Sequence, residues 1–297
     1  MSLTNGKELV VALGGGHGLA ASLRSLVLAG TDPLGVVSVA DDGGSSGRIR
    51  ADFGLEPPGD VRKCLVALAA HSSIWTSVFD YRFESGELSG HSLGNLIIAG
   101  LTEVTGDFTF AIKLAQDLIG AKGALLPSST EPVTLAAKVG GQVVIGQVNV
   151  MRSSGIESVY TIPESPPVPE AVLAAIKTAG TIVAGPGSLF TSVLAVLCVP
   201  GIQAAVKESF GQKIYVVNLR QQPSETLDFN ISDHIRALVE YGFVPDLILA
   251  DNAFMELGDS LSFCKRIGAK LVVHQLADPS GRVHDPILLA NAFKEYG

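Results

Sequence analysis

The sequence is poor in cysteine and has no long apolar run. Its three cysteines, Cys64, Cys198 and Cys264, are isolated and form no C-x-x-C pair. A disulfide framework or a zinc site is therefore not expected, and this cysteine usage favours a reducing, cytoplasmic compartment. The most apolar region, residues 193–199, is too short and too close to prolines to cross a bilayer, so no membrane span is expected.

Positive charge is scarce as well. The 297 residues include 21 lysines and arginines against 29 aspartates and glutamates, which gives a net charge of −8. This balance disfavours a general nucleic-acid-binding protein and offers no basic face to a membrane. No G-K-S or G-K-T occurs in the chain, which argues against a P-loop nucleotide-binding site.

Apolar residues, in contrast, make up 47% of the chain, enough for a substantial core. The length fits one large α/β domain or two smaller ones. Short apolar runs typical of buried strands alternate with helical patterns, which predicts an α/β fold with a mainly parallel sheet. Because this alternation resumes after the middle of the chain, we interpret residues 1–297 as a single domain.

In the middle of the chain the sequence pattern changes from alternating strands and helices to consecutive strands. Residues 133–138 and 142–146 flank Gly140-Gly141 and predict a β-hairpin, and residues 158–162 predict another strand. A proline-rich connector follows them. We interpret residues 123–165, approximately, as a small β insertion within the α/β domain.

The stretch Gly14-Gly15-Gly16-His17-Gly18 connects a short apolar strand, residues 9–13, with an amphipathic helix, residues 19–28. Glycine permits positive φ and a close approach of the backbone to a ligand. A helix N-terminus adds unpaired N–H groups and a partial positive charge. The loop therefore predicts an anion site, most often for phosphate, although a tight turn without a ligand is the alternative.

An acidic stretch follows the second predicted strand, residues 34–39. Asp41 and Asp42 precede Gly43-Gly44-Ser45-Ser46-Gly47. In nucleotide-binding α/β units an acidic residue at this place commonly meets a ribose, and loops after parallel strands face one crevice. A plain surface loop is the alternative. We expect one aspartate to brace the loop and Asp42 to face the crevice, where it would hold Mg²⁺ or a sugar hydroxyl.

A third loop, residues 185–192, follows the predicted strand 181–184 and includes Gly187 and Ser188. Like the first loop, it contains glycines and joins the end of a buried strand to the start of a helix. We therefore expect free N–H groups and a second anion site there.

Residues between the first loops leave two interpretations open. Arg48 or Arg62 would meet a ligand phosphate, or would pair at the surface with a nearby acidic residue, Asp52 or Glu56. Asp60 is expected to be the N-cap of a helix over residues 61–70.

Five motifs occur in order and together resemble the gluconeogenesis factor family, a branch of the CofD-like superfamily that also contains 2-phospho-L-lactate transferase. They are Gly14-Gly15-Gly16-x-Gly18-Leu19, residues 40–48 (ADDGGSSGR), residues 57–62 (PPGDVR), residues 90–95 (GHSLGN) and residues 185–192 (GPGSLFTS). The resemblance runs from about Leu9 to Asp285. It departs from the family pattern at His17, where the family usually has threonine, and over residues 220–225.

The resemblance implies a Rossmann-like, doubly wound fold with helices on both faces of the sheet. It also implies a cytoplasmic regulatory protein that binds a UDP-sugar such as UDP-N-acetylglucosamine and supports growth and cell shape on gluconeogenic carbon sources. The alternative is a magnesium-dependent transferase with a nucleoside-diphosphate-linked donor, similar to 2-phospho-L-lactate transferase. A homo-oligomer is one alternative for the assembly.

Combined with the loops above, the resemblance implies one ligand site. Arg282 is expected to reach the ligand from the C-terminal end of the chain, where a guanidinium suits a diphosphate. The expected ligand-binding residues are Gly14, Gly15, Gly16, His17, Gly18, Asp41, Asp42, Gly43, Gly44, Ser45, Ser46, Asp60, Arg62, Asn95, Gly187, Ser188, Asn218 and Arg282.

Overall fold

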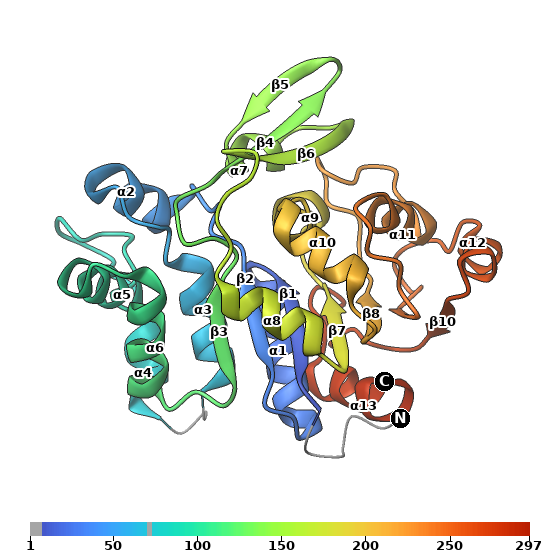
Figure 1. The fold of residues 1–297 in the computed structure, drawn as a ribbon, viewed down its shortest axis with the longest axis horizontal. Helices are drawn as coiled ribbons and strands as arrows, with labels where there is room; N and C mark the ends of the chain where they lie inside the picture. Colours follow the sequence, from blue (N-terminus) through green and yellow to red (C-terminus); the bar gives the residue numbers. More distant parts are fainter. Residues whose placement is uncertain (1–7, 70–72) are drawn as a thin grey trace.

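The computed structural model describes residues 8–69 and 73–297. Its main sheet has seven strands in the order β10-β9-β8-β7-β1-β2-β3, and each neighbouring pair is parallel (Figure 1). The strands are β1 (Val10–Gly14), β2 (Leu34–Val37), β3 (Ala124–Pro127), β7 (Thr181–Ala184), β8 (Gln212–Val216), β9 (Leu247–Ala250) and β10 (Lys270–Val273). The prediction of a mainly parallel sheet is confirmed.

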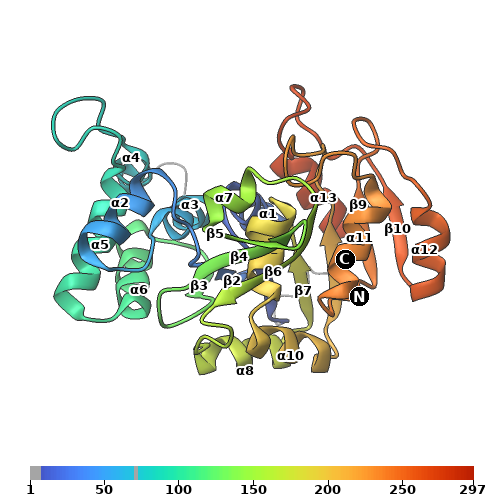
Figure 2. The ribbon, with the colours of Figure 1, turned by 90° about the horizontal axis from the view of Figure 1, so that it is seen from above.

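Helices cover both faces of this sheet. Figure 2 shows α1, α3 and α13 on one side and α8 and α10 on the other. Because both faces are covered, every residue of β1, β2, β7 and β9 is buried, which explains their continuous apolar runs. The helices are α1 (Gly16–Ala29), α2 (Gly44–Phe53), α3 (Gly59–Leu68), α4 (Ile74–Asp80), α5 (Leu93–Thr105), α6 (Phe108–Ile119), α7 (Gln147–Met151), α8 (Glu170–Thr178), the π-helix η1 (Leu189–Val193), α9 (Leu194–Leu197), α10 (Pro200–Glu208), α11 (Ile231–Glu240), α12 (Ser260–Ile267) and α13 (Pro286–Tyr296).

The strand order reverses at β1. The chain first builds β2 and β3 on one side of β1, and later returns to place β7 on the other side. In open α/β sheets ligands bind beyond the carboxyl ends of the strands at such a switch point. The fold therefore directs attention to the loops that follow β1 and β7.

The β insertion is a separate three-stranded antiparallel sheet, β5-β4-β6, at the top of Figure 1. It contains β4 (Thr134–Val139), β5 (Gln142–Ile145) and β6 (Ile156–Ile162), with α7 between the last two. The predicted hairpin and the predicted third strand are confirmed. The predicted start near residue 123 is wrong, because β3 pairs with β2 in the main sheet.

Two local predictions near the first loops are also corrected. The stretch after Asp42, expected to be a loop, becomes helical at Gly44. Its sequence carries no apolar stripe, so periodicity could not find this helix. Asp60 is not an N-cap: α3 begins at Gly59 with Pro58 at the N-cap, and Asp60 stands in the first turn. Ala70, the predicted end of that helix, lies outside the described residues.

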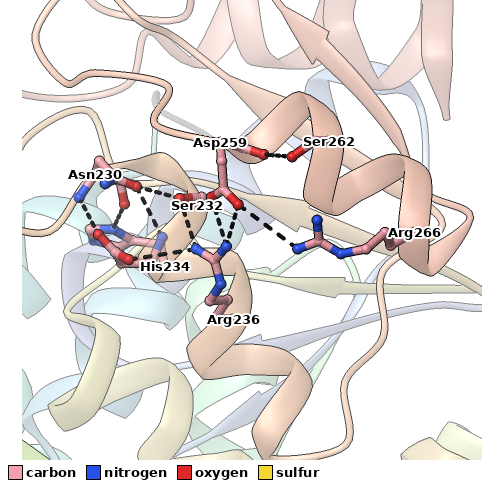
Figure 3. A network of polar contacts seen from close by, with 8 residues as sticks. Asn230, Ser232, His234, Arg236, Asp259, Ser262 and Arg266 are labelled. Carbon is pink, nitrogen blue, oxygen red and sulfur yellow. Dashed lines mark hydrogen bonds and ion pairs between the residues drawn. The ribbon is translucent and has the colours of Figure 1, made fainter.

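Polar contacts hold α11 and α12 together (Figure 3). Asn230 and Asp233 form a capping box at the start of α11. The Arg236 guanidinium donates to both carboxylate oxygens of Asp259 at 2.7 and 2.6 Å, and Arg266 lies 3.8 Å from the same carboxylate. These contacts fix the end of the long loop after β8, which forms one wall of the candidate site.

Candidate functional site

The glycine-rich loop after β1 lies against the loop after β7. Gly16 has a φ of +59°, a left-handed conformation that favours glycine. At Gly18 a Cβ atom would overlap the carbonyl group of Pro186. Gly16 therefore shapes the turn, and Gly18 lets the two loops meet at the switch point of the sheet.

The N-terminus of α1 presents backbone donors without a partner. Its N-cap residue, Gly15, has no side chain that could accept a hydrogen bond. Within residues 8–69 and 73–297, no acceptor is found for the backbone N–H groups of Gly16, His17 or Gly18. Three free donors and the positive end of a 14-residue helix form an arrangement that suits a phosphate group.

The loop after β7 differs, because side chains of the loop after β8 already accept from four of its backbone N–H groups. Asn218 Oδ1 accepts from the Gly187 N–H at 3.0 Å, and Gln222 Oε1 accepts from the Leu189 N–H at 3.3 Å. Glu225 is 2% exposed and accepts from the N–H groups of Phe190 and Thr191 at 3.1 and 3.3 Å. Among residues 186–191, only the Ser188 N–H has no acceptor within the described residues, so the expected set of free N–H groups is largely filled from within the protein.

A cavity of about 400 Å³ lies at the N-terminus of α1. We call it the glycine-loop cavity. Two carboxylates and one cation dominate its charge: Asp41, Asp60 and Lys63, with Lys63 Nζ 3.0 Å from Asp60 Oδ1. Burial, and the nearby charge of Asp60, raise the pKa of Asp41. The lining residues are Gly15, Gly16, His17, Gly18, Asp41, Gly43, Asp60, Lys63, Gln147, Val148, Met151, Gly187, Ser188, Thr191 and Ser192.

The two adjacent aspartates have different roles, as expected, but the roles are exchanged: Asp42 was expected to face the crevice, and Asp41 does so. Asp41 lines the glycine-loop cavity, and its carboxylate also accepts from the Gly43 N–H at 3.0 Å. Asp42 turns away and accepts from the Val148 N–H at 2.9 Å. Asp42 therefore anchors α7 of the insertion, and Asp41 is the carboxylate available to a ligand.

A second cavity, of about 320 Å³, adjoins the first at His17 and Gly18. We call it the C-terminal cavity, because its far wall is formed by Arg282, Val283 and His284. No ion pair of the Arg282 guanidinium is found in the part of the chain that the structure describes; Asp278 instead accepts from the backbone N–H of Arg282. The other lining residues are Ala21, Pro186, Gly187, Ser188, Asn218, Leu219, Arg220, Gln221, Gln222 and Pro223.

His284, the last residue of this wall, is itself buried. Burial lowers its pKa to about 4, against smaller opposing effects of a backbone contact with Val217 and the charge of Asp251. Asp251 accepts from the backbone N–H groups of Leu276 and Ala277 at 2.9 and 3.1 Å. These contacts fix the segment that carries Arg282.

The remaining sequence-predicted residues support the site from behind. Asn95 is 3% exposed and donates to Ser45 Oγ at 3.0 Å, and the Ser46 hydroxyl accepts from the Gly59 N–H. Neither Asn95 nor Ser45 lines the glycine-loop cavity or the C-terminal cavity. Arg62 is buried in an ion pair with Asp80, so the expected alternative partners Asp52 and Glu56 are not used.

Sequence reasoning missed several residues of the site. Lys63 lies three residues after Asp60, one helical turn away. This spacing could have indicated the ion pair between Lys63 and Asp60. Gln222 and Glu225 gave no local signal, because their partners lie 33 to 35 residues earlier in the chain. The same holds for Val148, which enters the site from the insertion.

A metal-binding cluster or a membrane-spanning helix would each point to another function of the described residues. No group of three or more histidine, cysteine, aspartate or glutamate side chains that could hold a metal ion is found among them. Among the same residues no single helix is long and apolar enough to cross a membrane. One pair, Leu189–Leu197 and Pro200–Glu208, passes that test only when joined across a 73° bend.

Comparison with known proteins gives the family. The family model described as 2-phospho-L-lactate transferase CofD matches residues 10–260. The chain belongs to the CofD family. Within it, a relative from Halalkalibacterium halodurans named gluconeogenesis factor is 41% identical over 82% of this chain and 77% of its own length. The Bacillus subtilis protein of the same name is 39% identical over 82% of this chain and 78% of its own length.

A longer relative from Nostoc is 41% identical over 77% of this chain but only 51% of its own length. Among solved structures, a UPF0052 family protein from Bacillus halodurans superimposes with a TM-score of 0.91 at 34% identity, covering 97% of this chain and 99% of that one. The resemblance seen in the sequence is thus confirmed, and this CofD family chain groups with the gluconeogenesis factors.

Proposed function

We propose that this CofD family chain is a regulatory protein that binds a nucleoside diphosphate sugar, UDP-linked by preference, as in UDP-N-acetylglucosamine. The observation that carries the proposal is the set of free N–H groups on Gly16, His17 and Gly18 at the start of α1. The loop after β7 has no run of three free donors, because Asn218, Gln222 and Glu225 accept from four of its N–H groups. We therefore assign the diphosphate to the first loop alone.

The charge of the glycine-loop cavity supports a cation in the complex. Asp41 and Asp60 both line it, and Lys63 alone offsets them. A diphosphate brought next to two carboxylates is repelled unless a cation lies between them. Mg²⁺ commonly takes one or two carboxylates together with phosphate oxygens, so Asp41 is the residue we propose for it.

Calorimetry with UDP-N-acetylglucosamine, UDP and GDP, each with and without Mg²⁺, tests the proposal. We expect saturable binding that Mg²⁺ strengthens. In a thermal-shift screen, a ligand at 100 times its Kd would stabilise the chain by about 2.7 kcal/mol. Absence of binding by every UDP-sugar and GDP compound at millimolar concentration would contradict it.

The name gluconeogenesis factor, which the relatives carry, supports a role in growth on gluconeogenic carbon sources. We propose in addition that the chain acts in the cytoplasm and affects cell shape. Expression of this chain in a Bacillus subtilis strain that lacks its own gluconeogenesis factor tests that role. We expect restored growth and rod shape with the natural chain, and no restoration with Gly16→Val. If the natural chain and Gly16→Val both restored growth and rod shape, the role in growth would not depend on ligand binding.

A transferase is the second candidate, and one observation favours it. The glycine-loop cavity and the C-terminal cavity meet at His17, so a donor and an acceptor would have room on the two sides of His17, with Asp41 in the first cavity. Incubation with Mg²⁺, a guanosine-diphosphate-linked 2-phospholactate donor and the deazaflavin acceptor tests this. Turnover that Asp41→Asn abolishes would establish the enzyme and overturn the purely regulatory role.

A further inference from the structure

A third cavity, of about 420 Å³, lies between the β insertion and α11. We call it the α11 cavity. Its walls come from the start of β6, from Phe190 of η1, from residues 227–229, and from α11 with the adjacent Tyr241. It shares no lining residue with the glycine-loop cavity or the C-terminal cavity. It is therefore a separate hollow, of a size that suits a small molecule.

Contacts within the protein hold these walls together. The Tyr241 hydroxyl donates to the carbonyl oxygen of Val159 at 3.0 Å and accepts from the N–H of the same residue at 2.6 Å, which ties the end of α11 to β6. Glu225 accepts from the Phe190 N–H at 3.1 Å, which ties the loop before residues 227–229 to η1. The cavity is thus built from segments that are fixed to one another.

Much of the lining is apolar. Ile156 and Phe190 are buried, and the rings of Phe190 and Phe229 pack edge to face with their centroids 6.1 Å apart. Leu227 lines the same cavity and is 51% exposed. A molecule with a hydrocarbon body would cover Leu227 and so remove apolar surface from water.

The charge of the lining is mainly negative. Four acidic side chains and one basic side chain line the cavity: Glu157, Asp228, Asp233, Glu240 and Arg236. The Arg236 guanidinium is already bound by Asp259, outside the lining, at 2.7 and 2.6 Å (Figure 3). The basic side chain therefore does not offset the four carboxylates, and the cavity favours a cation.

Asp228 and Glu240 are the carboxylates most open to a ligand. Both are exposed, and neither forms an ion pair within residues 8–69 and 73–297. The other two are engaged, since Glu157 accepts from the Gly141 N–H at 3.2 Å and Asp233 belongs to the capping box of α11.

The composition of the walls indicates which kind of cation fits. Mg²⁺ and Ca²⁺ need several converging oxygen ligands. Among the described residues, no group of three or more acidic, histidine or cysteine side chains could hold a metal ion. An ammonium group needs fewer carboxylates, and aromatic rings attract it as well. An organic cation with an apolar body matches both parts of the lining.

We propose that the α11 cavity binds a small aliphatic amine in its protonated form. The hydrocarbon body lies against Leu227, Phe190 and Phe229, and the ammonium group lies beside Asp228 and Glu240. This site does not rest on the proposed nucleotide function, because the α11 cavity and the nucleotide site share no lining residue.

Calorimetry of the whole chain with hexylammonium tests the site. The controls are 1-hexanol and hexanoate, which have the hydrocarbon chain without the positive charge, and methylammonium, which has the charge without the chain. We expect saturable binding of hexylammonium that is about tenfold tighter than the binding of any control, because only hexylammonium satisfies both the carboxylates and the apolar wall.

Two charge variants locate the ammonium group. Asp228→Asn keeps a residue type that tolerates the φ of +66° at this position, and Glu240→Gln keeps the length of the side chain. We expect each to weaken hexylammonium binding about threefold, and the double variant about tenfold, as for ion pairs near the surface. Glu103→Gln is the matched control, since it removes the same charge from an exposed position on α5, at the opposite end of the molecule (Figure 1).

Leu227→Ala tests the apolar contact. It should lower the preference for hexylammonium over methylammonium about threefold, because it removes hydrocarbon from the wall. Leu261→Ala, at an exposed leucine of α12, is the control and should leave this preference unchanged.

The proposal is overturned if hexylammonium at millimolar concentration does not bind, or binds no more tightly than 1-hexanol. It is also overturned if the double variant of Asp228 and Glu240, with an unchanged urea midpoint, binds hexylammonium as the natural chain does. Equal weakening by Glu103→Gln would contradict it as well, because the net charge of the chain would then attract the amine. UDP binding decides the proposed function separately.

Discussion

The carboxylate of Asp42 accepts a hydrogen bond at 2.9 Å from the backbone N–H of Val148, 106 residues later in the chain. This contact holds α7 of the insertion over the glycine-loop cavity, where Val148 is a lining residue. The neighbouring Asp41 is left to face the cavity. One aspartate thus positions the wall of the site, and the other meets the proposed ligand.

Asn substitutions at these two positions form a matched pair. Each keeps an oxygen that can accept the observed backbone hydrogen bond, and each removes one negative charge. We expect Asp41→Asn to abolish the effect of Mg²⁺ on UDP binding, and Asp42→Asn to change the affinity less than about threefold. Calorimetry with and without Mg²⁺ checks both. A larger effect at Asp42 would restore it as the ligand residue.

Gly16→Val is expected to abolish nucleotide binding while the fold persists. A β-branched side chain at a φ of +59° is strained and blocks the approach of a phosphate to α1. Gly54→Val is the control, since Gly54 has a φ of +71° at the C-cap of α2 with open space around it. Both variants should lose about 1–2 kcal/mol of stability in urea unfolding, and only Gly16→Val should lose binding.

Arg282→Ala is expected to weaken UDP binding about tenfold, because a guanidinium at the C-terminal cavity donates to a charged ligand. Arg282→Lys should recover only part of the affinity, since lysine lacks the planar fork. Arg266→Ala serves as control. Unchanged affinity in Arg282→Ala would make Arg282 a surface residue.

Glu225→Ala is expected to destabilise the chain by about 1–3 kcal/mol, because it leaves buried backbone donors of Phe190 and Thr191 without acceptors. Denaturation by urea measures this loss. Glu256→Ala, an acidic residue at an exposed position, provides the comparison. Equal stability of Glu225→Ala and the natural chain would show that water satisfies these donors.

The stability of the chain should fall in acid partly through His284. Its pKa is about 4 in the folded state against 6.5 for an ordinary histidine, so the unfolded chain takes up the proton first as the pH falls. The contribution of His284 is therefore complete above pH 6.5 and is lost between pH 6.5 and 4, a change of about 3 kcal/mol. Urea unfolding of His284→Gln should show a correspondingly weaker pH dependence over this interval. An identical dependence would refute the assignment.

Local pattern in the sequence determined much of this protein. Apolar runs such as residues 9–13 and 181–184 predicted the buried parallel strands, because strands covered on both faces need apolar residues throughout. The glycines between β1 and α1 predicted the turn and the open helix N-terminus, because these depend on neighbouring residues only.

Tertiary structure alone decided which polar groups of the loops stay open to a ligand. The Asp42 carboxylate is engaged by Val148, and four donors of the loop after β7 are filled by side chains 31 to 35 residues further along the chain. Such contacts arise when packing brings distant segments together, so no periodicity records them. The sequence thus predicted loops of similar composition after β1 and β7. Packing left three consecutive free donors in the first loop and filled four donors of the second.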